Sequence, residues 1–551
     1  MYRSLIVALA CFLPLAVTAT DAVPAPVQTG LAQIREADLR ADIGFLASDA
    51  MKGRLAMEQG DDIAVQWVVS EFTKAGLKPA ATDAQGKASF LQPVPLIAYS
   101  PDSEATRLVL VRKGKHSSWK TPEVSGRFPA DLDVHAPVVF AGYGITDPGL
   151  HYDDYANVDV KGRIVVVFTG EPQENDPNSI FNGNGNTRNA AARVKLLTAQ
   201  AHGAVAVLIA PVPSGSAMSP MQRSARYANA DKGKPHPEHA TFALADDQIH
   251  IPSMLISSEV MTELLATSGS TPVQLQMAID KDLKPESRAL PDTEVSLHFA
   301  SRVEKKGTTW NVAGLLQGSD PALAAETIII SGHHDHHGEN KDGAIFHGAD
   351  DNASGTAGVV ALAHAFMANP ARPKRSILFV VFGAEEPGLL GSYYMAAHPL
   401  RPLATTRAVI NFDMIGRDEK PSIQTDGIME VPADTSNRLN LIGSVYSPDY
   451  RRTVGEQNAH VGLVLDDRFD HDAVNNVLFR SDQFPFVLKN IPAFWWFTGF
   501  HPDYHRITDT AEKIDYAKMA RILRLAYLSA WQFADGRQPP RFLVDPRGRA
   551  N

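Results

Sequence analysis

Residues 328–337, Ile-Ile-Ile-Ser-Gly-His-His-Asp-His-His, join an apolar run to a cluster of potential metal ligands. The pattern predicts a buried strand that ends in imidazole and carboxylate groups. Side chains alternate between the two faces of a strand, so His333 and Asp335 would share one side. A histidine that binds a metal needs a carboxylate or carbonyl on its second ring nitrogen, which Asp335 could supply. The stretch is equally compatible with a histidine-rich surface loop that binds metal only loosely.

Further carboxylates and imidazoles follow the other apolar runs of the C-terminal half. The runs are residues 327–330, 376–383, 408–412 and 491–497, and the polar groups after them are Asp350 and Asp351, Glu385 and Glu386, Asp413, and His501, Tyr504 and His505. In open α/β sheets, sites form beyond the carboxyl ends of the strands. The sequence therefore predicts that these side chains meet at one edge of a sheet.

The predicted donors are nitrogen and oxygen atoms without a thiolate, a set that suits zinc and also cobalt or manganese. Two histidines and three carboxylates exceed the three protein ligands of a single catalytic zinc. They suffice for two metals that share one carboxylate, an arrangement that activates a water and polarises a carbonyl. A further carboxylate must stay uncoordinated to move a proton, so the Glu385-Glu386 pair offers one ligand and one base.

The elements that must position these groups alternate between strand and helix from residue 308 onward. Continuous apolar runs predict an α/β fold with a mostly parallel twisted sheet between layers of helices. Helical spacing predicts a helix over residues 61–75, with Asp61 or Asp62 as its cap and Gly76 as its left-handed stop. Residues 131–290 instead hold strands separated by loops, which indicates a separate β-rich module.

The motifs in this order resemble those of the secreted di-zinc aminopeptidases, whose superfamily includes glutamate-carboxypeptidase-like and transferrin-receptor-like proteins. The matching stretches are Gly-His-His-Asp at 332–335, Gly-Ala-Asp-Asp-Asn-Ala-Ser-Gly at 348–355, Gly-Ala-Glu-Glu at 383–386, Asn-Phe-Asp-Met at 411–414, Asp-Tyr-His at 503–505 and Lys-Gly-Arg at 52–54. The module at 131–290 resembles the protease-associated (PA) domain that is often inserted in this family. Supporting residues are Tyr143, Asp154-Tyr155, the stretch Asp-Val-Lys-Gly at 159–162 and a predicted helix from Lys195.

The resemblance assigns a role to each motif residue. His333, Asp351 and Asp413 would bind one metal, and Asp351, Glu386 and His505 the other, with Asp351 as the bridge. Asp350 is the alternative bridge, and the motif spacing favours Asp351. Asp335 would orient His333, Glu385 would be the general base, Tyr504 would stabilise the carbonyl oxyanion and Arg480 would lie near the substrate amine. The remaining histidines of these motifs are expected to be solvated or to support the ligands from outside, namely His334, His336, His337, His347 and His501.

Composition and charge limit the partners of this chain. It has 551 residues, 44% of them hydrophobic, and a net charge of −10, so a basic surface for nucleic acid is not expected. Arg3 and the apolar residues 5–17 form a secretory signal pattern with cleavage near Ala19, and the alternative is an uncleaved anchor. Cys11 is the only cysteine, so a mature exported chain would have no disulfide. Lipid attachment at Cys11 is the alternative to cleavage near Ala19.

These observations predict an exported, periplasmic or extracellular aminopeptidase with two zinc ions per chain, acting on peptides that have a free N-terminus. The alternatives are a carboxypeptidase or glutaminyl-cyclase-like relative on the same scaffold, and a non-catalytic receptor-like binding protein. After signal cleavage no stable membrane insertion is expected, and the oligomeric state is open. The expected division is a signal peptide at 1–19, parts of the peptidase domain at 30–130 and 291–537, the PA domain at 131–290 and a loosely ordered tail at 538–551.

Overall fold

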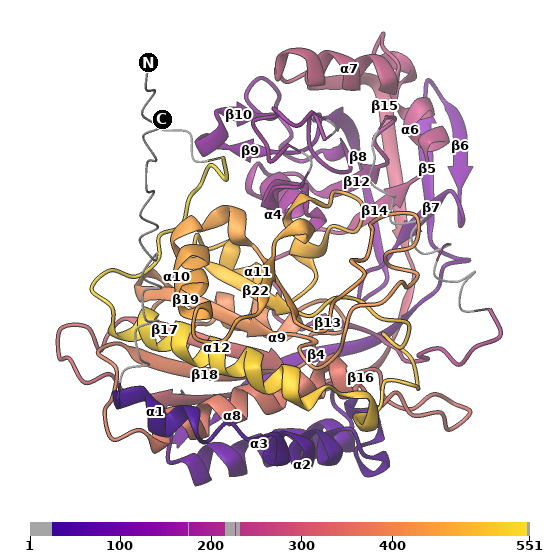
Figure 1. Ribbon diagram of the computed structural model, residues 1–551. Helices are drawn as coiled ribbons and strands as arrows, with labels where there is room; N and C mark the ends of the chain where they lie inside the picture. The colour runs from indigo at the N-terminus through magenta and orange to yellow at the C-terminus, as the bar shows by residue number, and fades with distance from the viewer. Residues whose placement is uncertain (1–24, 175, 184, 215–225, 227–231, 548–551) are drawn as a thin grey trace, which may run out of the picture.

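The computed structural model describes residues 25–174, 176–183, 185–214, 226 and 232–547 (Figure 1). The predicted signal peptide, with Cys11 and Ala19, lies outside the described residues, so export stays a prediction. Among the helices that the structure describes, none combines the length and the apolar character that crossing a membrane requires.

A ten-stranded sheet in the described part of the chain carries the strand ends that the motifs follow. Its order is β13-β4-β16-β18-β17-β19-β22-β20-β21, with β1 paired to β16. The central strands β18, β17, β19 and β22 are parallel, whereas β16 and β20 pair antiparallel with the edges of this group. The α/β fold is confirmed, and its mostly parallel character holds for the centre of the sheet. The bounds are β1 Lys78–Pro79, β4 Leu91–Pro101, β13 Thr241–Leu244, β16 Ser301–Leu316, β17 Thr327–His333, β18 Ser376–Phe382, β19 Thr406–Phe412, β20 Arg438–Ile442, β21 Val464–Asp466 and β22 Ala493–Phe497.

Helices cover both faces of this sheet, which explains why its central strands are apolar on both sides. Ile328 and Ile330 of β17 point into one core and Ile329 into the other. Figure 1 shows α1, α2, α3 and α8 together below the sheet, with α9 and α11 on its other side. The bounds are α1 Ala25–Leu31, α2 Glu36–Leu46, α3 Gln59–Ala75, α8 Gly355–Ala368, α9 Leu390–Ala397, α10 Pro448–Asn458, α11 Phe484–Val487 and α12 Tyr516–Asp535.

A second sheet forms the module that the sequence placed at residues 131–290. It has eight strands in the described residues, in the order β6-β5-β15-β8-β11-β12-β14-β7, and β8, β11, β12 and β14 are parallel. The sheet reaches beyond the predicted range on both sides, because β5 to β7 and β15 complete it. Within that range, β13 leaves the module and pairs with β4 of the larger sheet. The bounds are β5 Arg107–Arg112, β6 Lys115–Trp119, β7 Val124–Gly126, β8 Leu132–Phe140, β11 Ile164–Phe168, β12 Ala206–Ala210, β14 Ser253–Ile256, β15 Arg288–Phe299, α4 Ala192–Ala201, α6 Ser258–Leu264 and α7 Pro272–Asp282.

The helix predicted over residues 61–75 is α3, and Gly76 ends it in the left-handed conformation as expected, with φ of 82°. The predicted cap is wrong. The helix begins two residues earlier, and Asp61 is a fully buried residue inside it rather than a cap. Its carboxylate accepts hydrogen bonds from the backbone N–H of Met57 at 3.1 Å and the hydroxyl of Thr309 at 2.7 Å. Tertiary contacts therefore override the local capping preference of aspartate.

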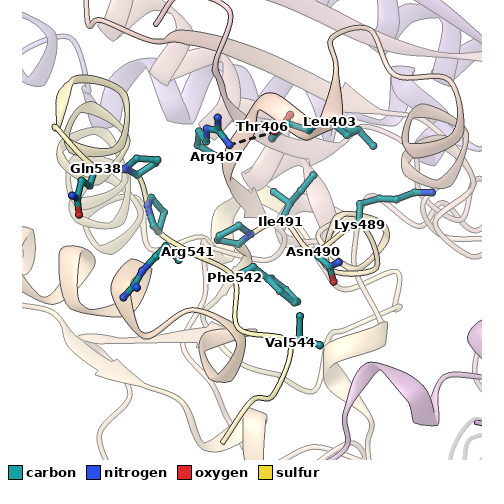
Figure 2. A pocket seen from close by; sticks show the side chains of 14 residues that line it. Leu403, Thr406, Arg407, Lys489, Asn490, Ile491, Gln538, Arg541, Phe542 and Val544 are labelled. Atoms are coloured by element: carbon teal, nitrogen blue, oxygen red, sulfur yellow. Dashed lines mark hydrogen bonds between the residues drawn. The ribbon is translucent and has the colours of Figure 1, made fainter. Parts of the chain in front are cut away.

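The described part of the C-terminal tail, residues 538–547, has no helix or strand but packs against the rest of the protein. The Phe542 ring stacks on Tyr446 with centroids 5.1 Å apart, and Arg547 donates to the Pro177 carbonyl at 2.6 Å. The tail closes one side of a cavity of about 690 Å³ near the beginnings of β19 and β22 (Figure 2). None of the predicted site residues lines this cavity, which lies at the opposite ends of the strands.

Candidate metal centre

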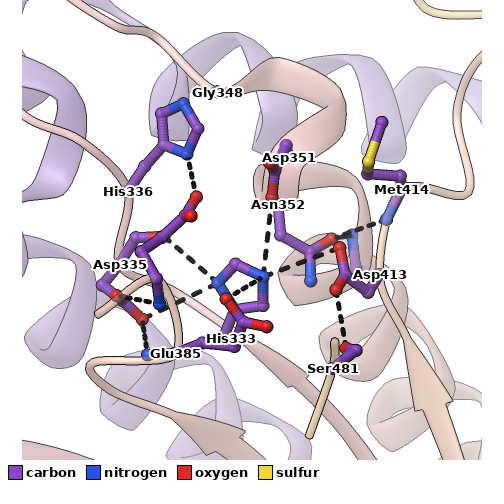
Figure 3. Close-up of polar contacts among 12 residues, drawn as sticks. His333, Asp335, His336, Gly348, Asp351, Asn352, Glu385, Asp413, Met414 and Ser481 are labelled. Carbon is purple, nitrogen blue, oxygen red and sulfur yellow. Dashed lines mark hydrogen bonds and ion pairs between the residues drawn. The ribbon is translucent and has the colours of Figure 1, made fainter. Parts of the chain in front are cut away.

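The predicted ligands converge at the carboxyl ends of the parallel strands (Figure 3). His333 is the last residue of β17, Asp413 follows β19 directly, and Glu386 lies four residues after β18. Asp351 lies in the irregular turn Ala349–Ser354 that leads into α8, and His505 lies in the loop after β22. Because these strands are parallel neighbours, their carboxyl ends bring residues more than 150 positions apart to one edge.

The first ligand group consists of His333, Asp351 and Asp413. The Nε2 atom of His333 lies 3.6 Å from Asp351 Oδ1 and 3.6 Å from Asp413 Oδ1. All three side chains are buried, and one donor atom from each lies within 4.8 Å of the others. The His333 Nε2 atom is buried without a hydrogen-bond partner. A buried nitrogen that faces two carboxylates without such a bond is the arrangement that a metal ion satisfies.

The second group consists of Asp351, Glu386 and His505, and it shares Asp351 with the first. The Nε2 atom of His505 lies 3.0 Å from Asp351 Oδ2 and 3.3 Å from Glu386 Oε2. The two oxygens of Asp351 thus face different histidines, as a bridging carboxylate requires. Both donor sets, one histidine with two carboxylates each, are of the kind that zinc accepts.

Asp350, the alternative bridge, lies away from both groups. Its Oδ1 accepts a hydrogen bond from the backbone N–H of Gly416 at 2.7 Å, and its Oδ2 lies 3.2 Å from Nε2 of His501. The backbone N–H groups of Asp350 and Asp351 both donate to Asp509, at 3.0 and 3.1 Å. Asp509 therefore fixes the turn that directs the two adjacent carboxylates to opposite sides.

Asp335, the predicted orienter of His333, contacts the histidine mainly through its backbone. The His333 Nδ1 atom lies 3.2 Å from the Asp335 carbonyl oxygen and 3.7 Å from its carboxylate. The carboxylate instead accepts the backbone N–H groups of Glu385 at 2.9 Å and Glu386 at 3.2 Å. Asp335 thus holds the turn that carries both glutamates.

Glu385, the predicted base, lies beside the first ligand group. Its Oε2 is 3.8 Å from His333 Nε2, and only 7% of the residue is exposed. Burial raises the pKa of Glu385 well above its ordinary value.

Asp482, which the sequence reasoning did not select, is fully buried near Glu385, and burial raises the pKa of its carboxyl to about 7. In the sequence, only its position two residues after Arg480 could have indicated that Asp482 lies at the site.

A hydrogen-bonded chain of three neutral side chains supports Asp413, and sequence reasoning gave none of them a role. The Ser481 hydroxyl donates to Asp413 Oδ2 at 2.6 Å, the Asn411 amide donates to Ser481 at 2.8 Å, and Ser331 donates to Asn411 at 2.8 Å. Asn411 stands in the same motif as Asp413, which was the available signal. Such contacts fix the direction in which a carboxylate ligand points.

Tyr504 and Arg480 lie together at the rim of the second group. The Tyr504 ring stacks on His505 with centroids 3.8 Å apart, and Arg480 Nη2 donates to the Tyr504 hydroxyl at 3.1 Å. The Arg480 guanidinium also lies over the Phe500 ring, 5.2 Å from its centroid. The two residues that the resemblance related to the substrate are thus in mutual contact.

The other histidines are buried rather than solvated, with the exception of His347. His334 lies between Asp61, 2.9 Å away, and the Trp310 carbonyl, 2.9 Å away. His336 and His337 are both directed at Glu386. His347 is partly exposed and contacts Asp49 at 2.8 Å. The expectation was that these side chains are solvated or support the ligands from outside. His336 and His337 contact the predicted ligand Glu386, which agrees with the second of these two possibilities.

Arg54 positions the loop that carries these histidines. It is 1% exposed, and its guanidinium donates to the carbonyls of His334 at 2.7 Å, His347 at 2.8 Å and Gly348 at 2.9 Å. Burial lowers the pKa of Arg54 to about 10, so it remains a cation at neutral pH. The N-terminal Lys-Gly-Arg stretch at 52–54 is thereby tied to a loop almost 300 residues away.

Comparison with known proteins relates both parts of the chain to described families. Residues 311–529 match the model of peptidase family M28, and residues 134–264 match that of the PA domain. Leucine aminopeptidase 2 of Arthroderma otae is 28% identical over 213 residues, 37% of this chain and 36% of that protein. Leucine aminopeptidase 2 of Trichophyton rubrum is 26% identical over 250 residues, 40% of this chain and 44% of that protein.

The match thus spans less than half the length of these relatives. Among solved structures, the aminopeptidase from Aneurinibacillus sp. strain AM-1 aligns over 94% of this chain and 98% of that one. The identity is 19% and the TM-score 0.48.

Proposed function

Since the chain carries a peptidase family M28 domain with an inserted PA domain, we propose that it is a metal-dependent aminopeptidase with a two-metal site. The observation that supports this most directly is the pair of donor groups that share Asp351, with Glu385 beside them. Zinc is the proposed metal because each group combines one imidazole with two carboxylates. When bound, two such ions supply Lewis acidity to a scissile carbonyl and lower the pKa of an attacking water.

Glu385 is the proposed proton carrier. Its carboxylate would take a proton from the attacking water at Oε2 and deliver it to the leaving amine. Asp335 holds Glu385 in place by accepting a hydrogen bond from its backbone N–H, and the Glu385 carboxylate takes no part in that bond. The buried position beside His333 excludes bulk water that would compete for the proton.

Tyr504 is the proposed donor to the carbonyl oxygen. Arg480 donates to the Tyr504 hydroxyl oxygen at 3.1 Å, which places a cation directly beside the proposed donor. A donor placed where negative charge develops lowers the barrier of acyl transfer. Substrates would be peptides with a free N-terminus, because the carboxylates of Glu385, Asp413 and Asp482 favour a protonated amine beside the first group.

The test compares aminoacyl chromophores, N-blocked peptides and C-terminally scissile peptides, each with and without a chelator. We expect release from the free aminoacyl substrates alone and loss of release with chelator. Release confined to C-terminal residues would favour a carboxypeptidase, cyclisation of an N-terminal glutamine a cyclase, and inactivity of the zinc-loaded protein a receptor-like role.

Glu385→Gln tests the mechanism. We expect a fall in kcat of about 10²–10⁴-fold, because general acid–base catalysis contributes that much, while the zinc content stays at the wild-type value. Glu456→Gln, an exposed position on α10, is the matched control and should retain full activity. Wild-type kcat in Glu385→Gln would contradict the assigned base.

A further inference from the structure

A third group of potential ligands adjoins the second one, formed by His336, His337 and Glu386. One donor atom from each lies within 4.8 Å of the others. The Glu386 Oε1 atom is hydrogen-bonded to Nδ1 of His336 at 2.5 Å, and its Oε2 lies 3.3 Å from Nε2 of His337. The same Oε2 lies 3.3 Å from Nε2 of His505, so Glu386 stands between the second and third groups.

The imidazoles of this group are buried and leave nitrogens unsatisfied. His336 is fully buried and His337 is 9% exposed. The Nε2 atom of His336 and both ring nitrogens of His337 have no hydrogen-bond partner. Buried polar atoms in folded proteins are nearly always hydrogen-bonded. The unpaired Nε2 atom of His337, which faces the Glu386 carboxylate, therefore indicates a ligand that completes it.

The backbone around the two histidines is built to hold them in this position. The backbone N–H of His336 donates to the Arg54 carbonyl at 3.1 Å, and that of Gly338 donates to the Gly53 carbonyl at 2.9 Å. Gly348 lies against the His336 ring with a φ of +58°, and a Cβ there would lie 2.6 Å from ring atoms of His336. A glycine at this position is thus required for the ring to lie where it does (Figure 3).

We propose that His336, His337 and Glu386 form a third divalent-cation position, with Glu386 shared between it and the second group as Asp351 is shared between the first two. Two imidazoles and one carboxylate are a zinc donor set that leaves a fourth position open. The proposal rests on the proposed function in one respect, namely that the neighbouring groups also hold metal.

The test counts bound zinc by elemental analysis after equilibration at a fixed free zinc concentration and removal of unbound metal. We expect three zinc ions per wild-type chain and two per chain in His337→Leu. His347→Gln, which alters a histidine that contacts Asp49 instead of this site, should keep three. A parallel titration of the metal-free proteins with Co²⁺, followed by visible absorbance, should saturate at the same ratios.

The outcomes separate this proposal from the proposed function. Two ions in both the wild type and His337→Leu would overturn the third position and leave the two-metal peptidase intact. Two ions in the wild type and fewer in His337→Leu would also overturn it, because His337 would then serve the second metal. Fewer than two ions in the wild type would contradict the proposed function itself. If His337→Leu does not fold, His337→Gln gives the same count with a polar side chain of similar reach.

Discussion

The protein contains two buried clusters of charge that differ in how their polar atoms are satisfied. In the PA module, Asp154 accepts three hydrogen bonds, and Glu171 accepts two from Thr187. Lys195 lies fully buried among them and donates to the carbonyls of Tyr143 and Gly170. At the strand ends of the larger sheet, by contrast, His333, His336 and His337 keep ring nitrogens without hydrogen bonds.

The contrast shows that burial of charge does not by itself indicate a site. In the PA cluster the internal cation Lys195 opposes the carboxylates, and Asp154 and Glu171 accept hydrogen bonds while Glu174 does not. At the sheet edge, the three groups that the described residues form consist of imidazoles and carboxylates that face one another, and the nearby cation Arg54 bonds to backbone carbonyls instead of to these donors. Burial raises the pKa of Glu171 to about 8 and lowers that of Lys195 to about 8, so charges in the PA cluster are held at a cost. Three substitutions test this difference.

Asp351→Asn should have the largest effect. Removal of the shared ligand should weaken zinc binding by more than about 100-fold, since changes to residues that merely support a ligand already cost about 10–100-fold. Activity should fall in parallel. The melting temperature of the metal-free variant should equal or exceed that of the metal-free wild type, because one of several crowded carboxylates is neutralised. Lower stability without loss of zinc would assign Asp351 a structural role.

Lys195→Met should lower the stability of the protein and leave zinc binding unchanged, the reverse of the result expected for Asp351→Asn. Without the buried cation the surrounding carboxylates are uncompensated, and the free energy of unfolding of the module should fall by about 3–5 kcal/mol. Urea unfolding measures the fall, and Lys281→Met, at an exposed position of α7, is the control. The zinc content of the folded fraction should not change, since Lys195 lies outside all three ligand groups. A loss of zinc with unchanged stability would erase the distinction between the clusters.

Glu174→Gln should have the smallest effect and one that depends on pH. Burial raises the pKa of Glu174 from 4.5 to about 7, and neither carboxylate oxygen has a hydrogen-bond partner. Because the pKa of Glu174 is higher in the folded protein than in the unfolded chain, the folded state binds the proton more tightly. The stability that this contributes is complete below pH 4.5 and is lost as the pH rises through 7. The variant should therefore unfold like the wild type at pH 4 and be more stable by up to about 3 kcal/mol at pH 8. Equal stability of the two proteins at pH 8 would show that Glu174 is stabilised when ionised.

Much of the candidate site could be predicted because the motifs follow continuous apolar runs, which favour buried strands. The carboxyl ends of β17, β18, β19 and β22 meet wherever such strands are parallel neighbours, so the five donors converge. Asp61 shows where local rules fail. Its position at a helix start predicts a cap, but a hydroxyl and an imidazole from other elements surround it.

The sequence by itself determined the donor types, their order and the need for a covered sheet, because these depend on residue chemistry and periodicity. The motif spacing favoured Asp351 over Asp350 as the bridge, but only the tertiary structure gives the physical reason, since Asp509 from a distant loop sets the turn that directs Asp351 to His333 and His505. It also brought His336 and His337 to Glu386, because Arg54 and Gly348 fix the path of their loop. Such contacts depend on close approach between segments far apart in the chain, and periodicity carries no information on them.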